Sequence, residues 1–391
     1  MGKKPEFHGS DLEKIEEYYH IPKEEIVCFS ANVNPLGLSE AVRQKLCDHL
    51  DVICRYPDRA YTSLRQTIGA YCGADPAHIV VGNGSTELIS LLISQRAPKK
   101  ALVLGPTYSE YARELSLVGG SMEYYHLREA DDFVLDIDDF LSHVTGEVDM
   151  VILCNPNNPT SSAIPREDME RIIAQCQKQG VFVMIDETYV EFAPDVQAVS
   201  AVSLVPAYDN FMVIRGVSKF FAAPGLRFGY GITSNQTFLS ALLTHQNPWS
   251  LNSIGAFAGE EMLKDTDYIQ RTRALISKER AKMLARLAES STYKTYPAYA
   301  NFILARIQKE GVTSFDVFEK TIHQKLMIRD CSSFQELEGE YIRFCVMDPA
   351  DNDRLMDCLL DVEGMHLGTP LRAFGYRAKC IWVHRKIKLR T

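Results

Sequence analysis

The chain has no stretch of 18 consecutive apolar residues, and its first eight residues include no apolar segment of the kind found in a signal peptide. We therefore expect no membrane span and no secretion signal, and we predict a cytoplasmic protein. A basic stripe is also missing from the main body of the chain. With a formal net charge of -9 and a pI near 5.6, the protein is not expected to bind nucleic acid, which demands a basic surface.

The cysteines do not form metal-binding or disulfide patterns. Ten are present, but no two stand in a C-x-x-C pair, and several lie within apolar runs such as Ile152 to Cys154. This distribution is typical of buried thiols in a reducing compartment, and it predicts neither a zinc site nor a disulfide framework.

Apolar runs that alternate with helical patterns dominate the first 230 residues. Because these runs are apolar on both faces, we predict an α/β fold with a mostly parallel sheet covered by helices on both sides. The ligand site of such a sheet lies at the carboxyl ends of its strands. The predicted strands cover residues 79–81, 101–104, 122–126, 150–154, 181–185 and 211–214.

Polar residues follow several of these runs. The segment Gly82 to Thr86 opens a helix and could hold a phosphate with its free N–H groups. Tyr108 could stack on a flat ring, the segment Asn155 to Thr160 offers amide donors, and Asp186 ends an apolar run. Taken singly, each has a structural explanation: a helix cap, a core aromatic, a proline turn and an acid that ends a strand.

Lys219 stands just after the predicted strand 211–214, with Arg227 eight residues further on. Burial disfavours the ammonium form and lowers the pKa of a lysine, so the neutral amine could form a Schiff base with an aldehyde. A loop lysine that only extends its charge to solvent would give the same local pattern.

Taken together in this order, these segments resemble the fold type I family of aminotransferases, which use pyridoxal 5'-phosphate (PLP). The resemblance spans residues 8 to about 363. It implies a large domain with a seven-stranded, mostly parallel sheet flanked by helices, and a smaller α+β domain. We expect an N-terminal segment at 1–50 packed with the small domain, the PLP-binding domain at 51–270, the small domain at 271–363 and a basic tail at 364–391.

The resemblance also implies roles for individual residues. Lys219 would form the Schiff base and carry the proton, and Asp186 would pair with the ring nitrogen of PLP. Tyr56 would reach the cofactor phosphate of a second subunit, which implies a homodimer with shared sites. The other cofactor-binding residues implied are Asn158 and Tyr189 at the ring hydroxyl, Tyr108 on the ring face, and Ser85, Thr86, Ser218 and Arg227 at the phosphate.

Within this family, several further segments are similar to the L-threonine-O-3-phosphate decarboxylases of cobalamin biosynthesis, whose product is (R)-1-amino-2-propanol phosphate. They include His8 to Ser10, Phe29 to Gly37 and Asn247 to Asn252. Histidinol-phosphate aminotransferases and other class I/II aminotransferases are the alternative. Serine phosphate is a variant substrate, because one methyl group gives a pocket only about 1 to 3 kcal/mol of discrimination.

If the chain is a decarboxylase of this kind, four residues would hold the substrate anions: His8, Asn32, Arg329 and Arg343. We expect both arginines to end short apolar strands, which favours site positions over surface ion pairs. Which arginine takes the carboxylate and which the phosphate stays open.

Three positions depart from the family pattern. Gly216 stands where relatives place Ser or Thr, so one hydroxyl contact to the cofactor phosphate is lost or supplied elsewhere. Ser161 and Ser10 stand where glycine is usual. Ser10 with Glu13 also predicts a capping box at the first helix.

Overall fold

The computed structural model describes residue 7 and residues 9–361, and the predicted contacts of His8 and the predicted tail at 364–391 lie outside these residues. Its largest element is a seven-stranded sheet in the order β2-β8-β7-β6-β5-β3-β4. β8 runs antiparallel to both of its neighbours, whereas the other neighbouring strands are parallel. The strands are β2 (Ile79–Gly82), β3 (Lys100–Gly105), β4 (Ser121–His126), β5 (Met150–Cys154), β6 (Phe182–Asp186), β7 (Phe211–Gly216) and β8 (Gly229–Ile232).

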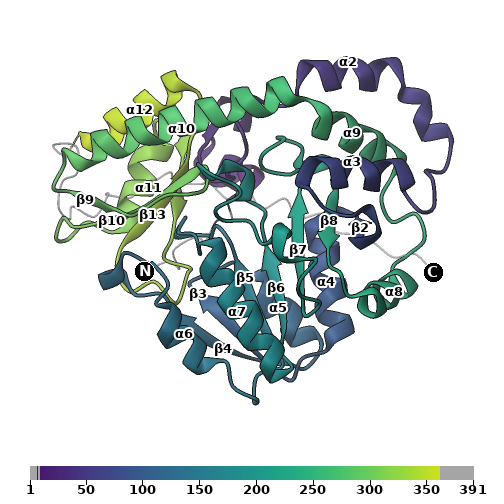
Figure 1. Cartoon of the computed structure of the whole chain (residues 1–391). Helices are drawn as coiled ribbons and strands as arrows, with labels where there is room; N and C mark the ends of the chain where they lie inside the picture. The colour runs from purple at the N-terminus through teal and green to yellow at the C-terminus, as the bar shows by residue number, and fades with distance from the viewer. Residues whose placement is uncertain (1–6, 8, 362–391) are drawn as a thin grey trace, which may run out of the picture.

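Both faces of this sheet are buried, as the apolar runs predict. In β5, Val151 and Leu153 belong to one apolar cluster, while Met150 and Ile152 belong to the other. The two faces are covered by helices that contribute to the same two clusters (Figure 1). These helices are α4 (Gly84–Arg96), α5 (Glu110–Leu117) and α8 (Gln236–His245) on one face, with α6 (Ile137–His143) and α7 (Arg166–Gln179) on the other. The prediction of a mostly parallel sheet between helical layers is confirmed.

A second, antiparallel sheet lies beside the first, in the order β12-β13-β10-β9. A separate two-stranded sheet forms where β1 (Val27–Cys28), from the N-terminal part of the chain, pairs in parallel with β11 (Leu326–Met327). The remaining strands are β9 (Tyr293–Thr295), β10 (Phe302–Ile307), β12 (Arg329–Asp330) and β13 (Tyr341–Cys345). The remaining helices are α1 (Leu12–Tyr19), α2 (Glu40–Asp48), α3 (Thr62–Cys72), α9 (Ser253–Lys264), α10 (Thr266–Ala288), α11 (Ser314–Ile322) and α12 (Pro349–Leu360).

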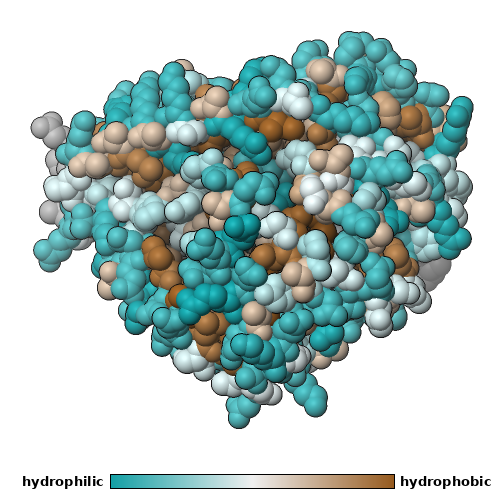
Figure 2. Space-filling model, in the orientation of Figure 1, coloured by the Kyte–Doolittle hydropathy of each residue, from teal (hydrophilic) through white to brown (hydrophobic). Residues whose placement is uncertain are grey.

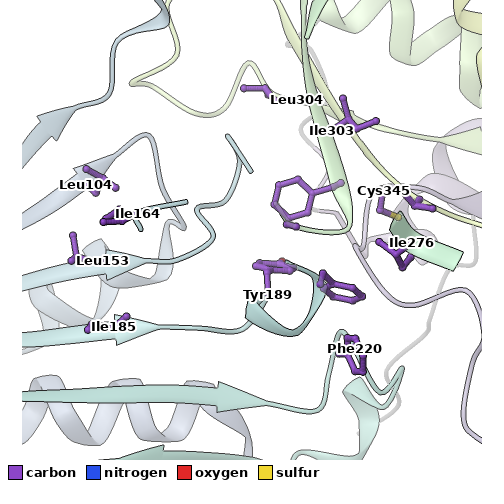
Figure 3. Close-up of a cluster of buried hydrophobic side chains, with 14 of the residues drawn as sticks. Leu104, Leu153, Ile164, Ile185, Tyr189, Phe220, Ile276, Ile303, Leu304 and Cys345 are labelled. Carbon is purple, nitrogen blue, oxygen red and sulfur yellow. The ribbon is translucent and has the colours of Figure 1, made fainter. Parts of the chain in front are cut away.

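Long helix α10 runs along the molecule to the smaller sheet, and the two sheets share one apolar core (Figure 1). Figure 3 shows part of this core: Leu153 and Ile185 lie on strands of the large sheet, Tyr189 lies past the end of the strand that carries Ile185, and Ile303 and Cys345 lie beyond it. The face drawn in Figure 2 is mostly hydrophilic, with separate apolar patches. Among the described residues, no helix combines the length and the apolar character needed to cross a bilayer.

The structure shows where several helices and strands begin and end. Asp265 separates α9 from α10, and its side chain accepts a hydrogen bond from the Tyr268 N–H and so caps α10. The capping box from Ser10 to Glu13 is wrong: α1 begins at Leu12, and Asp11 occupies the cap position. The idea that Arg329 and Arg343 end strands is also wrong, since Arg329 begins β12 and Arg343 lies in the middle of β13.

Candidate active site

The carboxyl ends of the parallel strands open onto a cavity of about 260 Å³ between the two sheets. Twelve of the fourteen predicted site residues line it; Tyr56 does not, and His8 lies outside the described residues. The predicted residues that line the cavity are Asn32, Ser85, Thr86, Tyr108, Asn158, Asp186, Tyr189, Ser218, Lys219, Arg227, Arg329 and Arg343.

Lys219 projects into this cavity from the turn after β7. Its Nζ donates a hydrogen bond to the backbone oxygen of Ala31 at 2.8 Å. Burial, with a smaller effect of the Arg343 charge, lowers the pKa of Lys219 to about 8. A substantial fraction of the amine is therefore neutral near physiological pH, which is the form that attacks a carbonyl carbon.

Asp186 lies at the end of β6 with both carboxylate oxygens hydrogen-bonded. Oδ2 accepts from the Tyr111 hydroxyl at 2.7 Å, and Oδ1 accepts from the Thr188 hydroxyl at 2.5 Å and the Thr188 N–H at 3.0 Å. Burial raises the pKa of Asp186, while these three donors oppose the shift. The carboxylate is thus held in one orientation at the wall of the cavity.

A glycine opens the turn between β2 and α4 on the same cavity. Gly84 has φ of +83°, and a Cβ there would lie 2.4 Å from Nη2 of Arg227. The Arg227 guanidinium therefore lies against bare backbone, next to Ser85 and Thr86 at the start of α4. Free N–H groups at a helix start, two hydroxyls and a guanidinium together make a site for a phosphate group.

Gly216 faces Ser85 across this turn. A Cβ at residue 216 would lie 3.6 Å from the Ser85 hydroxyl, so Ser85 stands close to where the side chain of a Ser or Thr at position 216 would lie. The Ser85 side chain therefore lies where it could supply the hydroxyl that Gly216 lacks.

Arg343 enters the cavity from the second sheet and is only 5% exposed. Its guanidinium donates to Oδ1 of Asn158 and, at 2.9 Å, to the backbone oxygen of Ser30. Its Nε is buried with no partner among the described residues. Asn32, which has φ of +57°, donates to the Tyr189 hydroxyl at 3.3 Å nearby.

Arg329 lines the same cavity from β12, beside the N-terminal segment. It donates to the backbone oxygen of Phe7 and, at 2.7 Å, to the Ser333 hydroxyl. Its guanidinium also lies 5.7 Å from the ring centre of Phe334. The cavity thus holds three arginines, Arg227 on one side and Arg329 and Arg343 on the other, and can accept a ligand with more than one anionic group.

Tyr56 lies outside this cavity and is 81% exposed. Its ring contacts Trp249, with ring centres 4.9 Å apart, and Arg59 lies 5.5 Å from the Trp249 ring centre. Within one chain, Tyr56 therefore contributes nothing to the site.

Sequence reasoning missed Tyr111, Thr188 and Ser30. Tyr111 lies three residues after Tyr108, so a helix predicted over both would have placed them on the same face; in the structure α5 begins at Glu110, after Tyr108. Thr188 could have been found as a short polar side chain two residues after Asp186. Ser30 acts through its backbone oxygen, which no side-chain pattern predicts.

The chain is similar to known proteins over most of its length. The family model described as aminotransferase class I and II matches residues 24–359. Threonine-phosphate decarboxylase of Salmonella typhimurium strain LT2 is 33% identical over 358 residues, which is 91% of this chain and 96% of that protein.

Two solved structures have the same fold. The histidinol-phosphate aminotransferase of Clostridium acetobutylicum superposes with a TM-score of 0.80 and 31% identity, over 86% of this chain and 98% of that one. The histidinol-phosphate aminotransferase of Sinorhizobium meliloti, solved in complex with pyridoxal-5'-phosphate, gives a TM-score of 0.78 at 22% identity, over 91% of this chain and 94% of that one.

Proposed function

Because the chain belongs to the class I and II aminotransferase family, whose cofactor is PLP, we propose that it decarboxylates L-threonine-O-3-phosphate to (R)-1-amino-2-propanol phosphate and CO2. The observation that carries this proposal is the 33% identity to a threonine-phosphate decarboxylase across 91% of this chain and 96% of that enzyme. The reaction would belong to cobalamin biosynthesis.

The cavity residues fit PLP by their chemistry. Lys219 offers a partly neutral amine for the aldehyde, and Asp186 offers a fixed carboxylate for the ring nitrogen. The missing side chain at Gly84 leaves the space that the Arg227 guanidinium occupies, and Arg227 with Ser85 and Thr86 would hold the phosphate. Asn158 and Tyr189 would hold the ring hydroxyl, and Tyr108 would cover one face of the ring.

PLP, when bound, supplies a conjugated ring that accepts the electron pair of a bond broken at the substrate α-carbon. The bond that breaks would be the one held perpendicular to that ring. The residues that bind the substrate anions orient the substrate and so determine which bond this is. In decarboxylation the C–COO bond breaks, CO2 leaves, and a proton takes its place on the α-carbon. The Lys219 amine would hold and deliver this proton, and the Asp186 carboxylate would pair with the ring nitrogen and favour its protonated form.

The substrate of this reaction carries two anionic groups, a carboxylate and a phosphate. Arg329 and Arg343 enter the cavity from the second sheet, and each could form charge-assisted hydrogen bonds with one of these groups. We propose that these two arginines bind the substrate anions, with Asn32 beside Arg343 and His8 as a further hydrogen-bond donor to an anion.

Histidinol-phosphate aminotransferase is the second candidate function. Its support is the solved structure of such an enzyme with 31% identity and a TM-score of 0.80. In that reaction the C–H bond stands perpendicular to the ring, and 2-oxoglutarate receives the amino group.

The test is an end-point assay of the PLP-loaded protein with L-threonine-O-3-phosphate and, separately, with L-serine-O-phosphate, in the absence of a keto acid. Release of CO2 supports decarboxylation and ranks the two substrates. If no CO2 is released but histidinol phosphate with 2-oxoglutarate yields glutamate, the aminotransferase function is correct instead.

We also propose that the protein is a homodimer with shared sites. Tyr56 is exposed beside two other exposed apolar residues, Ile53 (57% exposed) and Trp249 (40% exposed), which together form an apolar patch. A second copy would cover this patch, and its Tyr56 would reach the phosphate of the neighbouring cofactor.

A further inference from the structure

Tyr111 contacts the site only through other side chains. It is fully buried on α5, its hydroxyl donates to Oδ2 of Asp186 at 2.7 Å, and its ring packs edge-on against Tyr108 with centres 5.6 Å apart. One side chain therefore joins the residue proposed to cover the cofactor ring with the residue proposed to pair with its nitrogen.

Thr188 completes the surroundings of the same carboxylate. Its hydroxyl and its N–H donate to Oδ1 at 2.5 Å and 3.0 Å, so each oxygen of Asp186 has a fixed donor. The buried Cys154 thiol, whose pKa burial raises, also lies near Tyr111 and Asp186 and brings no positive charge. No arginine or lysine forms an ion pair with Asp186 among the described residues. Among the described residues, the hydrogen bonds from Tyr111 and Thr188 are therefore what favours the charged form of Asp186, against burial, which raises its pKa.

We propose that Tyr111 and Thr188 are positioning residues that keep Asp186 ionised, so that the proton shared with the cofactor nitrogen stays on the nitrogen. The inference rests on the proposed binding of PLP at this site. A hydrogen-bond donor favours the charged carboxylate over the neutral acid. Loss of a donor moves the shared proton toward Asp186, and the ring becomes a weaker electron acceptor.

The test is Tyr111→Phe, which removes the hydroxyl and keeps the ring. The protein is loaded with PLP labelled with 15N at the ring nitrogen, and its 15N chemical shift is recorded without substrate. We expect the ratio of nitrogen-protonated to carboxyl-protonated forms to fall about tenfold, as follows from losing a hydrogen bond to a charged group. Thr188→Val is expected to change the shift in the same direction.

A matched control is Tyr125→Phe. The Tyr125 hydroxyl also donates to an aspartate, Asp139 Oδ2 at 2.8 Å, and its ring also packs edge-on against an aromatic, but it does not line the cavity. Tyr125→Phe should leave the 15N shift unchanged. In the CO2 assay, Tyr111→Phe should lower kcat about tenfold with little change in KM, because Tyr111 is not expected to touch the substrate.

An unchanged 15N shift in PLP-loaded Tyr111→Phe overturns the proposal. If Tyr111→Phe does not retain PLP, Thr188→Val decides by the same criterion. Because the shift is read without substrate, it does not depend on which reaction the enzyme catalyses. If Tyr111→Phe shows the expected change in 15N chemical shift but the wild-type protein releases no CO2, the decarboxylase function is overturned and the positioning role of Tyr111 stands.

Discussion

Lys219 and Asp186 are both buried. Burial lowers the pKa of Lys219 and raises the pKa of Asp186, so it favours the neutral form of each side chain. For Lys219 the pKa falls to about 8, so the protein without PLP carries mostly ammonium below this pH and mostly neutral amine above it. Only the neutral amine attacks the aldehyde of PLP.

The lowered pKa of Lys219 predicts how the rate of PLP capture by the unliganded protein depends on pH. The capture rate should rise about tenfold per pH unit below pH 8 and level off above it, since the neutral fraction follows the pKa. The measurement is stopped-flow absorbance after mixing with PLP. Lys219→Ala should show no covalent capture of PLP and no turnover. If the variant kept both, Lys219 would not be the residue that forms the Schiff base.

Arg329 gives the sharpest test of substrate binding at the residue scale. Arg329→Ala removes a guanidinium that lines the cavity, and KM for the phosphorylated substrate should rise about tenfold to a hundredfold, as expected for lost charge-assisted hydrogen bonds. PLP affinity, measured by equilibrium titration, should change far less. Arg343→Ala should also raise KM, but Arg343 holds Asn158, so a modest loss of PLP affinity is expected as well. Equal losses of PLP and substrate binding in Arg329→Ala would contradict the assignment.

At the scale of elements, the site depends on how α4 begins. Gly84 starts this helix with φ of +83°, and its missing side chain leaves the space that Arg227 occupies. A Cβ there conflicts with the guanidinium, so the backbone conformation of this turn and the arginine are coupled.

Gly84→Ala should therefore lower stability and weaken PLP binding together. The positive φ costs an alanine about 1 to 2 kcal/mol, and displacement of Arg227 should raise the dissociation constant of PLP. Gly73→Ala is the matched control, because Gly73 ends α3 with φ of +75° and has nothing within 4 Å of an added Cβ. Thermal unfolding should show similar destabilisation of both variants without PLP, whereas only Gly84→Ala should bind PLP poorly. Equal PLP affinities would show that Arg227 is free to move aside.

At the scale of the whole molecule, one chain brings together a nearly complete site. The segments around the large sheet supply the proposed cofactor residues, and the smaller sheet supplies Arg329 and Arg343. The N-terminal part pairs through β1 with β11, which precedes β12 in the chain. Ion pairs from Glu129 to Lys294 (2.7 Å) and Arg306 (3.1 Å) link the loop after β4 to β9 and β10. The two sheets are thus held together around the cavity.

The proposed dimer makes a prediction at this scale. Light scattering should give a mass of about 88 kDa, twice the 44.1 kDa of one chain. Ile53→Asp places a charge in the apolar patch of Ile53, Tyr56 and Trp249 and should shift the mass toward one chain. Leu117→Asp, at an exposed apolar residue on α5 (66% exposed), is the control and should leave the mass unchanged. A wild-type protein of 44 kDa would exclude shared sites.

The sequence by itself determined the fold class, because strands buried on both faces leave unbroken apolar runs. It also indicated Ser85, Tyr108 and Asp186, because polar residues at the carboxyl ends of parallel strands meet at one edge of the sheet. Asn32, Arg329 and Arg343 were predicted from the resemblance to the aminotransferase family. Tertiary structure alone decided the rest. The pairing of Tyr111 with Asp186, and of Arg343 with Asn158, joins residues 75 and 185 positions apart, and no local pattern encodes such contacts. The capping box at Ser10 and the strand-end positions of the two arginines were wrong because chain ends and short strands are set by packing against distant segments. The depressed pKa of Lys219 likewise arises from burial between two sheets, which exists only in the folded protein.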